Sequence, residues 1–109
     1  AFDQDHGYAR TLGFRFGPVA YSTDLLDIPE PSFQALEGVK TWIVGCFSLK
    51  PHQTHAHVDK ALGWFERIKP ARAVITHMGP TIDYGELSAR LPDGVEAAYD
   101  GMVIEAEND

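Results

Sequence analysis

Ala73-Val74-Ile75-Thr76-His77-Met78 is the stretch of sequence that decides the fold. Its three consecutive apolar residues indicate a buried strand, and the polar Thr76 and His77 follow where that strand would end. In an open α/β sheet, ligands bind beyond the carboxyl ends of the strands. The stretch therefore predicts a functional site that includes His77.

Two other predicted strands end in polar segments in the same way. Tyr21-Ser22-Thr23-Asp24 closes one apolar run, and Pro51-His52-Gln53-Thr54-His55 follows the apolar residues 42–47. Several strand ends would thus deliver polar groups to one site.

The remaining elements follow from periodicity. Residues 11–16 alternate as in a half-buried strand. A helix is predicted by apolar residues at helical spacing, with Thr54 as its N-cap and Pro70 at its end; the apolar residues are Val58, Ala61, Leu62, Phe65 and Ile68. Further strands are expected at 19–22, 42–47, 72–76, 95–98 and 102–105, the last two around a turn at Asp100-Gly101, with short helices at 32–36 and 83–90. Strand, helix and strand over 42–76 predict a βαβ unit with parallel strands.

Composition limits the class of protein. The 109 residues are enough for one domain, and 44% hydrophobic with 23% charged residues is typical of a soluble globular chain without a membrane span. The single cysteine, Cys46, excludes a disulfide framework and is compatible with a reducing, cytoplasmic compartment. A formal charge of -7 disfavours nucleic acid as a partner.

The candidate chemistry rests on His6, Asp24, His55 and His77, each of which flanks an apolar element. Neutral imidazoles and a carboxylate suit zinc, manganese or iron, and such mixed sites are more often catalytic than structural. Spacing alone leaves other interpretations open: Asp24 as a loop or cap residue, His6 as a solvated terminal residue, and His77 as a histidine satisfied by hydrogen bonds.

The segment His55-Ala56-His57-Val58-Asp59-Lys60 is similar to the His-x-His-x-Asp-His metal motif of the metallo-β-lactamase superfamily, with Lys60 in place of the last histidine. We interpret this match as accidental. Val58 begins the apolar stripe of the predicted helix, Asp59 falls on its charged face, and a lysine beside metal ions would repel them. A mononuclear site on His55, His57 and Asp59 is the alternative.

A broader resemblance rests on six segments that occur in order: Gln4-Asp5-His6-Gly7, Leu12-Gly13-Phe14-Arg15-Phe16-Gly17, Tyr21-Ser22-Thr23-Asp24, Pro51-His52-Gln53-Thr54-His55, Thr76-His77-Met78 and Tyr99-Asp100-Gly101-Met102. Together they resemble the C-terminal half of metallo-β-lactamase-fold hydrolases, in the branch similar to the phosphoribosyl cyclic phosphate phosphodiesterase. The resemblance implies an α/β fold that is half of an αββα sandwich, a mixed sheet with flanking helices.

The resemblance also implies roles for four residues. His6, Asp24 and His77 match metal ligands, with Asp24 bridging two divalent ions, zinc or manganese. His55 matches a histidine that faces the substrate and donates a hydrogen bond to a phosphate oxygen or protonates the leaving group. In such sites a metal-bridging hydroxide attacks a phosphodiester or a related ester.

One departure from the family limits this interpretation, because the chain has no convincing copy of the His-x-His-x-Asp-His motif. We therefore expect residues 1–109 to be a single domain and the C-terminal part of a longer metallo-hydrolase, supplying only part of the site. An uncovered sheet face would leave apolar side chains exposed and favour a homodimer; the candidates are Leu12, Phe14, Phe16, Trp42 and Trp64.

Two alternatives remain open. The chain could be a non-catalytic α/β binding or interaction domain whose histidines are incidental. It could also keep the fold and hydrolyse another substrate, such as a thioester, a lactam or RNA. Convergence of His6, Asp24 and His77 separates the first alternative from the two-metal site.

Overall fold

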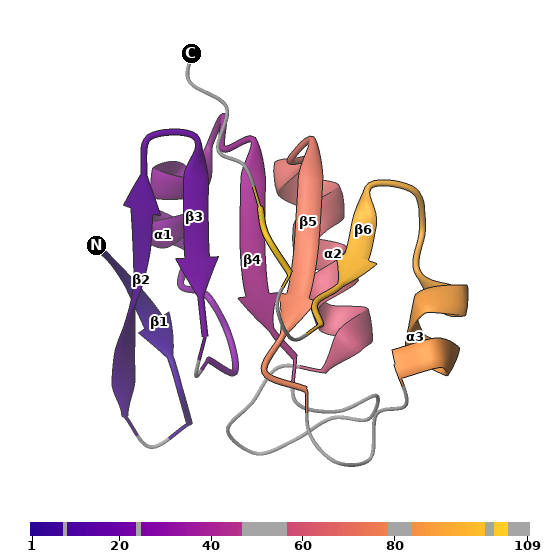
Figure 1. Cartoon of the computed structure of the whole chain (residues 1–109). Coiled ribbons are helices and arrows are strands. Elements are labelled where there is room, and N and C mark those ends of the chain that lie inside the picture. The colour runs from indigo at the N-terminus through magenta and orange to yellow at the C-terminus, as the bar shows by residue number, and fades with distance from the viewer. Residues whose placement is uncertain (8, 24, 47–56, 79–83, 100–101, 105–109) are drawn as a thin grey trace.

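The computed structural model describes residues 1–7, 9–23, 25–46, 57–78, 84–99 and 102–104. In these ranges a mixed sheet of six strands, ordered β1-β2-β3-β4-β5-β6, is accompanied by three helices (Figure 1). The elements are β1 (Phe2–Asp5), β2 (Arg10–Phe16), β3 (Val19–Ser22), α1 (Glu30–Leu36), β4 (Thr41–Gly45), α2 (Val58–Ile68), β5 (Arg72–Thr76), α3 (Tyr84–Arg90) and β6 (Val95–Ala97).

Strand direction places most of the strand ends at one edge. β1 and β3 are both antiparallel to β2, while β3, β4, β5 and β6 pair in parallel. Five strands, β1 and β3 to β6, therefore run in the same direction. Their carboxyl ends lie along the lower edge of the sheet in Figure 1.

Most elements predicted from periodicity are confirmed, including the parallel β4-α2-β5 unit and the mixed α/β sheet. The strand predicted at 102–105 is wrong for its described part, because residues 102–104 lie outside the strands and β6 pairs in parallel with β5 instead of forming a hairpin. The predicted turn at Asp100-Gly101 lies outside the described residues.

The two ends of α2 differ in how well the sequence predicts them. The N-cap position is occupied by His57 and not by Thr54, and no side chain caps the helix there. At the other end Lys69 adopts the left-handed conformation, with φ 54°, and its N–H donates to the Phe65 carbonyl just before Pro70. The prediction of Thr54 was wrong because the first turn begins three residues later than its capping pattern suggests.

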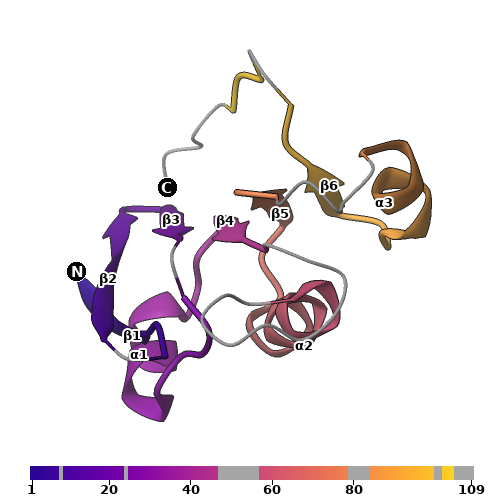
Figure 2. The ribbon, with the colours of Figure 1, turned by 90° about the horizontal axis from the view of Figure 1, so that it is seen from below.

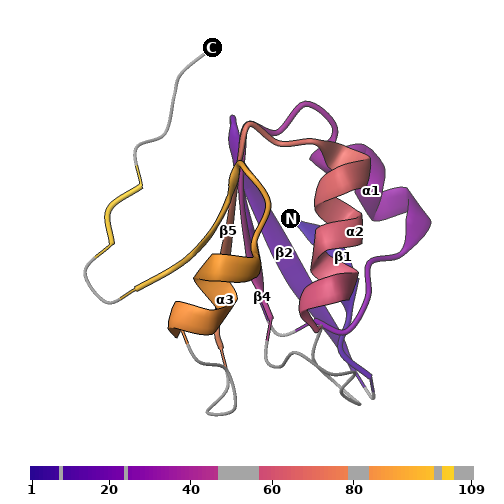
Figure 3. The same ribbon diagram turned by 90° about the vertical axis from the view of Figure 1, so that its right-hand side faces the viewer.

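One face of the sheet is covered by α1 and α2 (Figures 2 and 3). Trp42 of β4 stacks on Trp64 of α2, meets Phe65 edge to face, and donates from Nε1 to the buried Ser22 hydroxyl at 3.0 Å. The expectation that Trp42 and Trp64 are exposed is therefore wrong, because α2 packs against the sheet here and buries both rings between them.

The opposite face of β2 is open. Leu12, Phe14 and Phe16 point to this face and are exposed, Phe16 at 70%. Arg15 points to the helical side, where its guanidinium donates to the carbonyls of Ala35 and Glu37 at the C-terminal end of α1. The expectation of exposed apolar surface thus holds for the three β2 residues.

None of the helices in the part of the chain that the structure describes has the length and apolarity that crossing a membrane requires.

Candidate functional site

The predicted site residues lie at the carboxyl edge of the sheet. His6 directly follows β1 and is half-buried, and His77 directly follows β5 and is exposed. Asp24 and His55 lie outside the described residues, although Thr23, which precedes Asp24, follows β3 at the same edge. The strand order thus delivers three of the four predicted positions, or their immediate neighbours, to the edge where α/β sheets bind ligands.

Gly45, the last residue of β4, brings the ends of the neighbouring strands β3 and β5 together. A Cβ on residue 45 would lie 3.3 Å from the Cα of Thr23 and 3.3 Å from the Cβ of His77. Thr23 and His77 therefore approach residue 45 so closely that a Cβ there would be tightly packed against both. A glycine within a strand is a signal for such a close approach, and the sequence analysis did not use it.

The backbone of His77 leaves the sheet abruptly. Its φ of 55° is in the left-handed region, which non-glycine residues rarely adopt and which carries strain. Beside it lies a pocket of about 250 Å³, lined by Thr76, His77, Met78, Ala98 and Tyr99. His77 therefore borders a small pocket at the carboxyl edge of the sheet.

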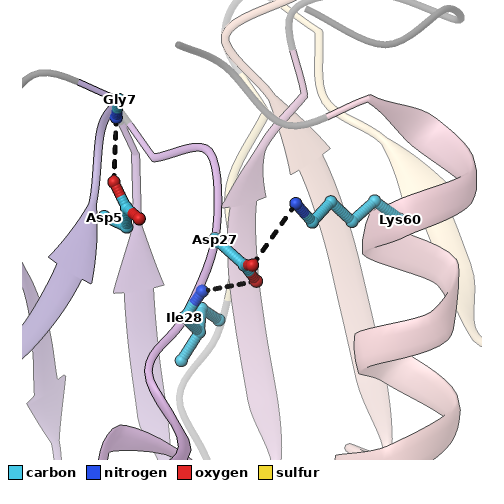
Figure 4. Close-up of polar contacts among 5 residues, drawn as sticks. All are labelled: Asp5, Gly7, Asp27, Ile28 and Lys60. Carbon is cyan, nitrogen blue, oxygen red and sulfur yellow. Dashed lines mark hydrogen bonds and ion pairs between the residues drawn. The ribbon is translucent and has the colours of Figure 1, made fainter. Parts of the chain in front are cut away.

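The turn that carries His6 is anchored on both sides. The Asp5 carboxylate accepts a hydrogen bond from Gly7 N–H at 2.9 Å (Figure 4), and His6 N–H donates to the Ala9 carbonyl at 2.9 Å. The backbone of Asp5 also pairs with Asp27 as an isolated bridge. These contacts hold the backbone on both sides of His6.

Asp27 connects this turn to α2. Its carboxylate accepts a hydrogen bond from Ile28 N–H at 2.9 Å and lies 3.6 Å from the ammonium group of Lys60 (Figure 4). Lys60 occupies the last position of the His-x-His look-alike segment, so its charge is directed to Asp27. Asp59 in that segment is exposed.

No group of three or more His, Cys, Asp or Glu side chains is placed to hold a metal ion within the described ranges. His6 and His77 are the two predicted ligands that fall in those ranges, and the roles of His6, Asp24, His55 and His77 stay predictions. Cys46 also follows a strand at this edge, but burial raises the pKa of its thiol to about 12. A thiol in that environment stays protonated and is a poor ligand or nucleophile.

The geometry is that of an α/β protein with a mixed sheet and with histidines that follow the carboxyl ends of two strands running in the same direction. The chain belongs to the β-lactamase superfamily, because the family model described as "Beta-lactamase superfamily domain" matches residues 1–78. The match ends directly after His77 and includes the positions of all four predicted site residues. The resemblance inferred from the six ordered segments is confirmed at the level of the superfamily.

Two known proteins show how far this likeness extends. A crystal structure of a diphosphatase from the PhnP family is 32% identical in sequence and superposes with a TM-score of 0.93, over 97% of this chain and 42% of that chain. An octanoyltransferase of Porphyromonas gingivalis is 26% identical over 99 residues, which are 89% of this chain and 20% of the relative. The chain thus spans less than half the length of either protein.

Proposed function

We propose that this chain supplies part of the active site of a metal-dependent hydrolase that cleaves a phosphodiester or a related phosphoester. His6, Asp24 and His77 are the proposed ligands of two divalent ions, zinc or manganese, and His55 is the proposed substrate-facing residue. Ligands of the kind that the family carries in its His-x-His-x-Asp-His motif would come from outside these 109 residues. The PhnP-family diphosphatase supports phosphoester chemistry as the reaction class.

The observation that carries the proposal is the approach of Thr23 and His77 across Gly45. It places the residue before Asp24 beside His77, although more than fifty positions separate them in the sequence. Two imidazoles and a carboxylate form a donor set that fits zinc or manganese. A pair of divalent ions would supply an activated water and would polarise the ester that is attacked.

Residues of this chain would position the metal ligands and the substrate. His77 leaves the sheet in a left-handed backbone conformation and lines the pocket with Met78 and Tyr99. The anchored turn at Asp5 fixes the approach of His6. His55 would donate a hydrogen bond to a phosphate oxygen or a proton to the leaving group.

We also propose a cytoplasmic location, in keeping with a single buried cysteine.

Metal binding by the purified protein tests this proposal. Equilibrium dialysis against zinc or manganese, followed by elemental analysis, should show bound metal that His77→Ala and His6→Ala both reduce. His57→Ala is the matched control, because His57 lies at the N-cap of α2 and belongs to the look-alike segment. Hydrolysis of bis(4-nitrophenyl) phosphate is the second readout, and it should be weak in this chain alone.

The possible outcomes separate the alternatives. Loss of metal in His57→Ala with no change in His77→Ala would favour the mononuclear site on His55, His57 and Asp59. A wild-type protein that binds no metal would favour the non-catalytic binding domain. Bound metal with cleavage of a thioester or lactam, and none of a phosphodiester, would retain the site and change the substrate.

A further inference from the structure

Gln4 is a buried polar residue that the proposed site has not yet used. Its side chain is fully buried in β1 and points to the same side as the buried Phe2. Burying an amide is unfavourable unless its hydrogen bonds are satisfied. An apolar residue would fill this place without that cost, so a specific contact is expected to account for the glutamine.

The contact is with the end of β3. The amide nitrogen of Gln4 donates to the Thr23 carbonyl at 3.0 Å and to the Thr11 hydroxyl at 3.1 Å. The orientation of the amide is fixed, because a backbone carbonyl such as that of Thr23 only accepts. Both N–H groups are thus used, while the oxygen of Gln4 is buried without a hydrogen-bond partner among the described residues.

Gly13 makes this reach possible. β2 lies between β1 and β3 in the sheet, so the Gln4 side chain must cross it to meet Thr23. A Cβ on residue 13 would lie 2.4 Å from the Gln4 oxygen and 2.3 Å from the Phe2 ring. Because Gly13 has no side chain, the Gln4 side chain can lie over β2 at this position and extend to Thr23.

We infer that Gln4 is a positioning residue for the proposed metal site, an inference that rests on the proposed function. It holds the Thr23 carbonyl, and Thr23 both precedes Asp24 and flanks His77 across Gly45. It also lies in β1, two residues before His6, which directly follows that strand. One amide thereby connects the segments that carry His6 and Asp24, and the second of these segments lies beside His77; residues behind metal ligands commonly act in this way.

The test compares Gln4→Met with Thr11→Val. Methionine matches the length of glutamine but cannot donate to Thr23, whereas Thr11→Val removes the other hydrogen bond and leaves the Thr23 contact in place. Binding of cobalt(II) is followed by its visible absorption, and hydrogen exchange of a peptide covering residues 22–28 is measured without metal. Urea unfolding shows whether both variants are folded and comparably destabilised.

Gln4→Met is expected to weaken cobalt(II) binding by roughly 10–100-fold and to speed exchange in residues 22–28, while Thr11→Val changes neither beyond its effect on stability. Equal effects of the two variants on both readouts would overturn the inference. If the wild-type protein binds no cobalt(II), the proposed metal function fails. Faster exchange in Gln4→Met would in that case still support Gln4 as the residue that holds the Thr23 segment, and unchanged exchange would overturn it.

Discussion

Replacing Gly45 by alanine tests whether the ends of β3 and β5 meet over β4. The added methyl would lie 3.3 Å from the Thr23 Cα and from the His77 Cβ. Carbon atoms pack best at roughly 3.5–4.0 Å, so both neighbours would have to move. Thr23 contributes a backbone atom, and its carbonyl is held by Gln4, so it cannot swing away as the end of a flexible side chain would.

The magnitude follows from two opposing effects. Overpacking a filled site costs roughly 1–3 kcal/mol, and removing a glycine from the unfolded chain returns roughly 0.4–1 kcal/mol. The net expectation is a loss of about 1–2 kcal/mol in the free energy of unfolding. In a chain of this size that loss lowers Tm by about 5–10 °C.

Urea unfolding followed by circular dichroism measures this difference, with Gly63→Ala as the control. Gly63 lies exposed in the middle of α2, and nothing lies within 4 Å of a Cβ placed there. That variant should gain roughly 0.5–1 kcal/mol, because alanine is the better helix former. A Gly45→Ala protein as stable as the wild type, alongside a stabilised Gly63→Ala, would refute the close approach of Thr23 and His77.

Three further outcomes are expected. Arg67 donates two hydrogen bonds to Glu30, at 2.9 and 2.7 Å, and thereby lowers the pKa of that carboxyl. Because the pKa is lower in the folded protein, this stabilisation is present at neutral pH and is lost as the pH falls through the folded pKa. Glu30→Gln should therefore flatten the acid side of a plot of the urea unfolding midpoint against pH. Cys46 has its pKa raised to about 12 by burial, so native protein should react with Ellman's reagent at neutral pH only as fast as it unfolds, and rapid labelling of folded protein would contradict its burial. We propose that the open face of β2 drives self-association, so Phe16→Ser should shift sedimentation towards the monomer, whereas Val103→Ser, which is 79% exposed but lies outside the strands, should not.

Periodicity predicts elements whose environment is uniform along their length. α2 has a continuous apolar stripe, and β4 is an apolar run buried between neighbouring strands, so both are evident in the sequence. β1 escaped prediction because Gln4 occupies one of its two inward positions, and a polar residue there hides the alternation. The burial of Trp42 and Trp64 depends on which face α2 covers, which residue spacing alone does not determine.

The candidate site also has a part that residue spacing predicts and a part that depends on how the strands are arranged. His6 and His77 could be selected because polar residues after apolar runs mark strand ends, and the parallel β4-α2-β5 unit orients one of those ends. The contributions of Gly45 and Gln4 could not be predicted from the sequence, because each depends on which strands are neighbours in the sheet. Gly45 matters only because β4 lies between β3 and β5, and Gln4 only because β2 separates β1 from β3.

The open face and the carboxyl edge are separate surfaces, and this separation affects where a partner can bind. Phe14 of β2 pairs across the sheet with Tyr21 of β3, and both are exposed on the face away from α1 and α2. His77, in contrast, leaves β5 at the strand ends. A second copy or another domain can therefore cover the Phe14 and Tyr21 face while the edge at His77 stays accessible. Self-association and metal binding should for that reason respond to different substitutions, and a loss of both in Phe16→Ser would show that the face and the edge are coupled.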